Sequence, residues 1–444
     1  MKQILILSSV VFVNSFAPAA AGGFALEQQD ANAIGAAYAG AQARFGDAGF
    51  AYHNPAAIFG TGSFQASFSI AALIPDTRYD NASAALLDAF PVAGRTQDDG
   101  ALENAAVPNF SAAFRLTDRV SAGLTINAPF GLNSKYAADS VIRYHALETD
   151  AKVVSIAPMA AIEPYHGLVI GAAVRIQVLD LEASTAIDAA GMALASGLPG
   201  FMPGTSDVFV ALDGDDVDMG FAVGAQAQLH DRLRIGASYA SKITHDLSGG
   251  ANFDLSASAA GQLINAMTGM FETTTFTSEF VTPASASIGA IFEASDALDL
   301  MASAVFTRWS DFEGLTTTFA NPAQPPDVFT QDWKDVWAFS AGGEYKLTRS
   351  ARVRAGFMFE DSPVNDAFAS PRIPDADRYW INAGVSYDIN DRLAVDGGLG
   401  IAILEKRRIN LSSAAPENMS RGDLTATFDT TGFVAALRLQ YRLR

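Results

Sequence analysis

Side chains that could perform catalysis or bind a metal are scattered along this chain. The histidines show no metal-ligand spacing, and the absence of cysteine excludes thiolate sites and disulfides. There is no G-x-S-x-G elbow and no P-loop. The acidic run Asp213 to Asp218 lacks the glycine and glutamate positions of a calcium loop, so it is interpreted as a solvated loop. We therefore predict no enzyme activity, no bound metal and no cofactor. The histidines are His53, His145, His166, His230 and His245.

The charge balance narrows the choice of partners further. The formal net charge of −19 argues against nucleic-acid binding, which needs a basic patch. The acidic residues gather in stretches that read as connections between elements, where a solvated surface explains them.

The N-terminus carries an export signal. Lys2 supplies a positive charge, residues 4–16 are mostly apolar, and Ala19-Ala20-Ala21 fits the small-x-small cleavage rule. We predict a signal peptide over 1–21 and a mature chain that begins at Gly22. A membrane anchor is the alternative, but the apolar run is too short for one. The rest of the chain has no run of eighteen apolar residues, which argues against a helical membrane protein.

Fourteen strand-like segments follow residue 60, joined by connections that alternate between short and long. In the first segment Phe64, Phe68 and Ile70 alternate with Gln65 and Ser67. Apolar residues facing lipid and polar residues facing a lumen would give this period of two. The alternation predicts an all-β protein, a 14-stranded antiparallel transmembrane β-barrel over residues 61–444. Together with the export signal it indicates the outer membrane of a Gram-negative bacterium. The short connections lie at 117–119, 164–167, 230–232, 294–296, 348–350 and 390–392.

Residues 22–60 differ from the barrel segments because they are rich in alanine and glycine and lack sustained alternation. The stretch from Asp30 to Ala43 is compatible with a short helix, and Asn54-Pro55-Ala56 reads as a turn. The pattern alone leaves two interpretations open, a plug inside the lumen or a periplasmic extension.

One long connection is unusually apolar for an exposed loop. Leu263, Met267, Met270 and Phe271 recur at spacings of three and four, which predicts a short amphipathic helix. A second apolar loop spans 186–201. The two loops are expected to pack on each other over the barrel mouth, to offer a surface for an apolar ligand, or to do both.

Several motifs, taken in order, resemble the FadL/TodX family of outer-membrane transporters. Gly22 to Leu26 resembles the family's mature N-terminus, and Asn54-Pro55-Ala56 resembles part of its plug, called the hatch. Residues 127–132 resemble the end of its third strand. Further matches lie at 35–40, 47–49, 309–312, 333–335, 361–364 and 373–380.

The resemblance implies a barrel with the hatch, residues 22–60, inside the lumen. It implies passive uptake of long-chain fatty acids or other hydrophobic molecules, captured between outer loops and released sideways into the membrane. The family's pattern places Phe24 and Leu26 near a tight apolar site and Phe130 and Gly131 beside the exit. The hatch residues carried over are Asn54, Pro55 and Ala56. A monomer in contact with outer-membrane lipid and lipopolysaccharide is expected.

One departure from the family concerns the ligand's head group. The family commonly has Tyr-Arg-Ser in the seventh strand, where this chain has Tyr239-Ala240-Ser241. Arg143, Lys152 and Arg175 remain as candidate carboxylate partners, although each fits a solvated or lumen-lining charge as well. Three alternatives to fatty-acid uptake therefore stay open, namely a channel for neutral or aromatic hydrocarbons, a general diffusion porin, and a barrel that only displays loops.

Overall fold

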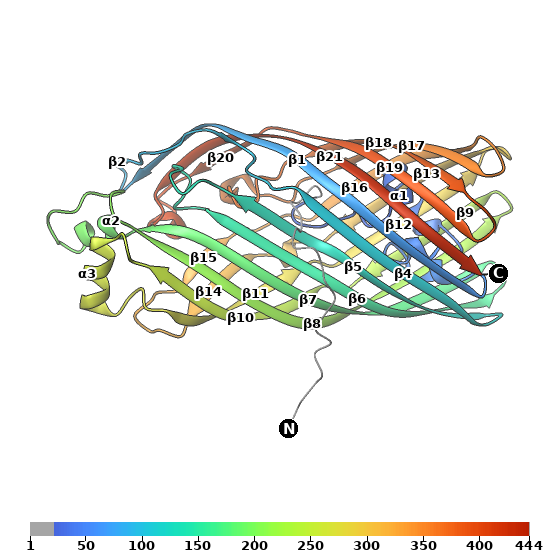
Figure 1. The fold of residues 1–444 in the computed structure, drawn as a ribbon, viewed down its shortest axis with the longest axis horizontal. Coiled ribbons are helices and arrows are strands. Elements are labelled where there is room, and N and C mark those ends of the chain that lie inside the picture. The colour runs from blue at the N-terminus through green and yellow to red at the C-terminus, as the bar shows by residue number, and fades with distance from the viewer. Residues whose placement is uncertain (1–21, 444) are drawn as a thin grey trace, which may run out of the picture.

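The computed structural model describes residues 22–443, in which fourteen strands close into one antiparallel barrel (Figure 1). The predicted signal peptide, residues 1–21, lies outside the described residues. The barrel strands are β1 (Phe64–Leu86), β4 (Ala105–Thr117), β5 (Val120–Lys135), β6 (Glu148–Tyr165), β7 (Leu168–Asp188), β8 (Asp207–His230), β9 (Leu233–Ala240), β12 (Ser285–Glu293), β13 (Leu298–Thr307), β16 (Val336–Lys346), β17 (Ala351–Glu360), β18 (Arg378–Asp388), β19 (Leu393–Leu404) and β21 (Asp423–Leu443).

Strand pairing follows chain order and closes between the two ends of the barrel. β1 pairs with β21 from Phe64↔Leu443 to Ala85↔Asp423, so the first and last strands form the seam. The predicted all-β, 14-stranded barrel is confirmed. The six predicted short connections join consecutive barrel strands at one end of the barrel, at the right of Figure 1.

The alternation of side chains matches the two faces of the wall. Phe68 and Ile70 point outward and are 49% and 40% exposed, whereas Gln65 and Ser67 are buried toward the lumen. The last strand repeats this pattern, with Leu437 outside. No helix among residues 22–443 is both long enough and apolar enough to cross a membrane.

The opposite end of the barrel carries additional elements that extend the wall and cover its mouth. Several stretches that looked like loops continue as strands, and the acidic run Asp213 to Asp218 lies within β8 rather than in the solvated loop that was expected. The additional strands are β2 (Phe90–Pro91), β3 (Asp98–Asp99), β10 (Ile243–Asp254), β11 (Thr274–Thr282), β14 (Gly314–Phe319), β15 (Asp327–Thr330) and β20 (Arg407–Leu411). The helices here are α2 (Ala189–Ala195), α3 (Ala259–Thr268), η4 (Trp309–Asp311), η5 (Asp366–Phe368) and η6 (Pro416–Asn418).

The N-terminal segment folds inside the lumen, as the plug interpretation predicts, and not as a periplasmic extension (Figure 1). The helix that was expected between Asp30 and Ala43 is shorter, and the segment is built from single turns capped by Asp30, Asp47 and Asn54. Its elements are α1 (Ala31–Gly35), η1 (Ala41–Ala43), η2 (Ala48–Phe50) and η3 (Pro55–Ile58).

Glycines in the wall let the hatch approach the strands closely. A Cβ on Gly224 of β8 would lie 2.0 Å from Oδ1 of Asn54, and one on Gly171 of β7 would lie 2.4 Å from the nitrogen of Ala56. Only glycine leaves room for the Asn54-Pro55-Ala56 turn against these strands.

Candidate functional site

Strand β5 is interrupted where the N-terminal segment meets it. Its pairing with β6 shifts register between Asn127 and Phe130, and its pairing with β4 stops at Ile126. Pro129 lies in this bulge and lacks a backbone donor. The break leaves backbone groups of β5 available at the edge that β4 no longer covers.

The N-terminal segment occupies that edge. Leu26 donates its backbone N–H to the carbonyl of Pro129 over 2.8 Å, and Gly131 donates to the carbonyl of Phe24 over 2.9 Å. The Gln29 side chain donates to the carbonyl of Ala128 over 2.7 Å. Residues 24–29 therefore replace a strand partner at the bulge, and Leu26 is buried beside it.

Phe24 lies at the centre of an aromatic cage. Its ring centroid is 4.7 Å from that of Trp309 and 5.8 Å from that of Phe130, and the whole group is buried. Close edge-to-face contacts of this kind stabilise beyond the area they bury. We call the group the aromatic cage; its members are Phe24, Phe130, Phe280, Trp309, Phe312 and Trp333.

Breaks between neighbouring strands place Trp309, Phe312 and Trp333 in the lumen, whereas Phe280 faces inward by the regular alternation of β11. β11 ends at Thr282 and β12 begins at Ser285, with Pro283 between them. β13 ends at Thr307, and η4 then brings Trp309 to the lumen, while Trp333 precedes β16. These irregularities free side chains from the in–out alternation, so the wall can present a dense aromatic surface at one level.

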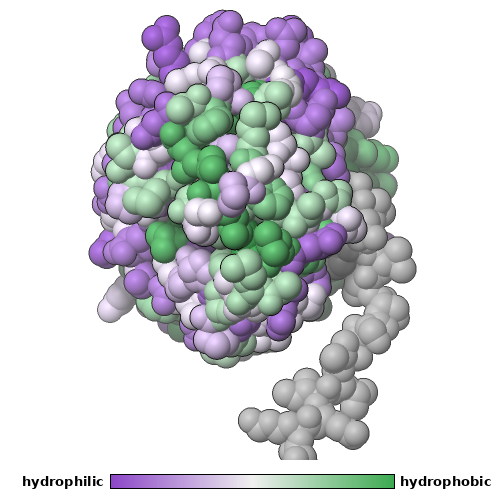
Figure 2. Space-filling model, turned by 90° about the vertical axis from the view of Figure 1, so that its left-hand side faces the viewer, coloured by the Kyte–Doolittle hydropathy of each residue, from purple (hydrophilic) through white to green (hydrophobic). Residues whose placement is uncertain are grey.

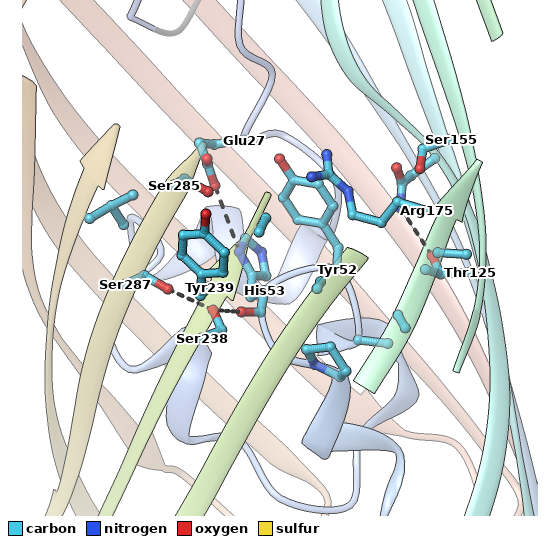
Figure 3. A pocket seen from close by; sticks show the side chains of 18 of the residues that line it. Glu27, Tyr52, His53, Thr125, Ser155, Arg175, Ser238, Tyr239, Ser285 and Ser287 are labelled. Carbon is cyan, nitrogen blue, oxygen red and sulfur yellow. Dashed lines mark hydrogen bonds and ion pairs between the residues drawn. The ribbon is translucent and has the colours of Figure 1, made fainter. Parts of the chain in front are cut away.

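A cavity of about 90 Å³ lies in the lumen beside the N-terminal segment (Figure 3). Glu27, Tyr52, His53 and Arg175 line it together with serine and threonine hydroxyls. Burial raises the pKa of Glu27 to about 7, with Glu360 as the second cause, and burial lowers the pKa of His53 to about 4. The 3.7 Å contact between Glu27 and His53 therefore involves a neutral imidazole at neutral pH. The cavity holds a few water molecules but not an acyl chain.

The three basic residues singled out from the sequence differ in their partners. Arg143 binds Asp207 at 2.9 Å and Tyr144, and Lys152 lies 2.6 Å from Asp150. Arg175 forms no ion pair within residues 22–443, and its Nη1 donates only to the carbonyl of Ser241 over 3.1 Å. Of the three, only Arg175 faces the cavity (Figure 3).

A buried charge cluster fixes the part of the hatch that contains Asp30 and Asp47, here called the lower hatch, to the barrel wall. Arg438 of β21 contacts Asp30 and Asp47 of the hatch at 3.1 Å each and Asp396 of β19 at 2.7 Å. Arg44 of the hatch lies 3.3 Å from Glu344, which also pairs with Arg354. The Asn54 amide donates to carbonyls of Gln42, Ala225 and Ala237, and Pro55 and Ala56 follow it in η3.

Apolar side chains gather on the face formed by the loops (Figure 2). Helices α2 and α3 pack on each other there, with Phe271 buried and Met270 half-buried beneath them. Met267 is 63% exposed and Leu263 is 37% exposed. The exposed apolar loop residues at this end are Leu87, Met202, Leu263, Met267, Val328 and Met419.

The structure brings Phe24 together with Phe130 and Gly131, but Leu26 belongs to a second apolar cluster with Ala128. Of the four loop residues, Met270 and Phe271 belong to a third cluster that is separate from the aromatic cage, whereas Leu263 and Met267 are exposed. Sequence reasoning missed Glu27, Tyr52 and His53 in the cavity and Phe280 in the cage, since no local pattern marks them. The sequence motifs around Trp309, Phe312 and Trp333 resemble the family, but nothing in them indicates that these rings surround Phe24.

Comparisons with known proteins agree with this architecture. Residues 10–443 match the profile of the family described as outer membrane protein transport protein (OMPP1/FadL/TodX). The chain is 26% identical over 417 residues to the long-chain fatty acid transport protein of Escherichia coli (strain K12), covering 87% of this chain and 89% of that protein.

Two solved structures share the fold. A Pseudomonas aeruginosa FadL homologue superposes with a TM-score of 0.87 at 24% identity, covering 95% of this chain and 100% of that one. The Pseudomonas putida toluene transporter TodX gives a TM-score of 0.69 at 17% identity, with 95% and 100% covered.

Proposed function

Because the chain belongs to the OMPP1/FadL/TodX family, and is therefore an outer-membrane transporter of hydrophobic compounds and not an enzyme, we propose that it takes up long-chain fatty acids. The observation that carries the mechanism is that one segment, Phe24 to Leu26, both fills the aromatic cage and covers the bulge in β5. A ligand that enters the cage competes with Phe24, and displacement of Phe24 pulls the segment off β5. Ligand binding and opening of the wall are thereby one event.

The apolar part of the ligand supplies the driving force. Each methylene transferred from water contributes about 0.8 kcal/mol, so an acyl chain can replace the contacts that Phe24 loses in the cage. Release through the bulge in β5 delivers the chain to lipid instead of water. Transport runs down the gradient, since no energy-coupling motif is found in the sequence.

Capture is assigned to the loop end. The exposed Leu263 and Met267 of α3, with Met270 and Phe271 behind them, offer an apolar surface whose methionines adapt to different ligands. An amphipathic molecule adsorbed there is held close to the barrel mouth before it enters.

The cavity favours a ligand with a carboxylate. Arg175 lines it without an acidic partner in the described chain, and its guanidinium reaches the carbonyl of Ser241, beside Ala240, where the family commonly has arginine. A basic group from β7 thus stands close to the position of the charge missing from β9. Planar guanidinium donors suit a carboxylate.

Uptake of matched ligands tests this proposal. Cells that lack the protein would be complemented with the wild type, with Arg175→Gln or with the control Arg352→Gln. Arg352 lies 3.1 Å from Asp388, and neither residue lines the cavity. We expect Arg175→Gln to lower oleate uptake at limiting concentration by roughly tenfold, the loss of a charged hydrogen bond, and to leave uptake of oleyl alcohol unchanged.

Two results would contradict the proposal in different ways. An equal loss for oleate and oleyl alcohol would exclude a carboxylate site at Arg175. Toluene uptake that depends on the protein while oleate uptake does not would instead favour a neutral-hydrocarbon channel.

A further inference from the structure

The first residues of the mature chain, as predicted from the cleavage motif, are held by two carboxylates. The backbone nitrogen of Gly22 lies 2.7 Å from Oε1 of Glu360, and that of Gly23 lies 3.2 Å from Oδ2 of Asp375. Glu360 ends β17, and Asp375 lies just before β18. Residues from the C-terminal part of the barrel therefore bind the first residues of the hatch.

The site around residues 22 and 23 leaves no room for side chains larger than those of glycine. Gly22 is buried, and a Cβ on it would lie 2.8 Å from Oε1 of Glu360. Gly23 has φ of +63°, and a Cβ there would lie 2.6 Å from Trp333 and 2.8 Å from Trp309 of the aromatic cage. Glu360 and the two tryptophans thus constrain where the nitrogen of Gly22 lies.

The carboxylate of Glu360 is buried and incompletely satisfied. The residue is 7% exposed, and its Oε2 accepts no hydrogen bond from the described residues. Nε of Arg378 lies 3.8 Å from this oxygen, too far for a hydrogen bond, and Nη2 of Arg378 binds Asp375 instead. Glu27 lines the same small cavity as Glu360 and adds a second acid. A backbone amide brings one hydrogen and no charge, so an acceptor stays unmet, which is costly in a buried site.

We propose that Glu360 is the docking carboxylate for the α-ammonium group that signal-peptide cleavage creates at Gly22. Hydrolysis of the peptide bond between Ala21 and Gly22 transfers the hydroxyl of water to the carbonyl carbon of Ala21. The nitrogen of Gly22 keeps its hydrogen, takes one from water and binds a further proton. An ammonium has three donors and a full charge, so it satisfies both oxygens of Glu360.

Cleavage therefore completes the closed state of the transporter. The docked ammonium lies two residues before Phe24 and so holds the backbone of this segment where the Phe24 ring can enter the cage. Glu360 acts as a positioning residue, because it contacts the segment that is displaced and not the ligand. The inference depends on the proposed function only for its effect on transport; the docking can be measured without ligand.

Labelling of the α-amino group tests the docking directly. The full-length mature protein would be purified from outer membranes in detergent, its intact mass measured, and its amines reductively methylated at pH 7. An α-amino group ordinarily titrates at about 7.7–8.0, and an ion pair that raises this by one unit leaves about a tenth of the reactive amine. We expect Gly22 to react about tenfold more slowly in the wild type than in Glu360→Gln. The control Glu293→Gln, whose partner Arg234 lies near a short turn, should react like the wild type.

The proposal is overturned if the intact mass shows a mature chain that does not begin at Gly22. It is also overturned if the wild type and Glu360→Gln react at the same rate. Should Glu360→Gln fail to fold, the wild type alone decides, because its Gly22 must react about tenfold more slowly when folded than in urea. Slow labelling combined with unchanged oleate uptake in cells lacking the protein would refute the proposed function and leave the docking intact.

Discussion

Glu27 and His53 face each other in the lumen with opposite responses to pH. The pKa of Glu27 is raised from 4.5 to about 7, so the folded state binds more protons than the unfolded state between these values, and its stability falls as pH rises. The pKa of His53 is lowered from 6.5 to about 4, so its contribution to stability is lost as pH falls through that range. The two effects are of similar size and oppose each other.

Single substitutions should expose each residue's contribution. In Glu27→Gln only His53 titrates, so the free energy of unfolding should fall by roughly 3 kcal/mol as the pH is lowered from 6.5 to 4. In His53→Gln only Glu27 titrates, so the free energy of unfolding should fall by a similar amount as the pH is raised from 4.5 to 7. Urea unfolding in micelles, followed by tryptophan emission across pH, measures both. Flat profiles in both variants would show that the pair does not titrate as described.

Arg143 has a structural role in the outer loops. It bridges Asp207 and Tyr144 and also donates to the carbonyls of Ala93 and Ser140. Arg143→Gln should lower the urea midpoint by an amount that corresponds to about 3 kcal/mol, because Asp207 loses its cation and keeps the hydroxyl of Tyr144. The ratio of oleate to oleyl alcohol uptake should stay at the wild-type value. A selective loss of oleate uptake would instead indicate that Arg143 binds the carboxylate of the fatty acid.

Among the structural elements, the hatch is divided into a fixed part and a releasable part. Asp30 and Asp47 are tied to Arg438, whereas residues 24–29 are held mainly by the edge of β5 and by the cage. Arg438→Met should destabilise the lower hatch by about 3–5 kcal/mol, since three carboxylates lose their shared cation. Urea unfolding compared with Arg442→Met, whose partner Asp388 is half-buried, isolates the effect. Equal midpoints for the two variants would argue against anchoring by Arg438.

The bulge in β5 is the element on which sideways release depends. Ala128 and Pro129 of β5 together oppose Val154 of β6, so deletion of Pro129 alone removes the extra residue and allows regular pairing. We expect the barrel to form and oleate uptake to fall to the level of cells without the protein. Unchanged uptake would mean that the ligand leaves through the lumen instead.

The period-two pattern predicted the barrel because each strand's in–out alternation is a local property that the wall preserves. The charge cluster around Arg438 could not be predicted, since Asp30, Asp396 and Arg438 meet only after the chain ends have closed. The acidic run in β8 was misread as a loop because an extended wall above the membrane also carries charge. The cage escaped prediction because a strand break, not spacing, turns Trp309 inward, and because no local pattern shows that Phe280 of β11 meets it.

At the scale of the whole molecule, the hatch blocks the barrel. Its turns contact strands around the lumen, and the cavities beside it that Glu27 lines with Arg175 and with Glu360 are small. A planar bilayer containing the wild type should therefore conduct ions weakly, and deletion of residues 22–60 should raise the conductance of each barrel by tenfold or more, on the order of a change from a plugged to an open lumen. Conductance that is high in the wild type and unchanged by the deletion would identify a general diffusion porin.

The last strand both completes the circle of strands and carries Arg438, the cation that holds Asp30 and Asp47. A chain still missing β21 has neither a closed barrel wall nor the cation that holds Asp30 and Asp47, although Arg44 and Asn54 still contact the wall. During biogenesis, closure of the wall and anchoring of Asp30 and Asp47 are thus completed by the same strand.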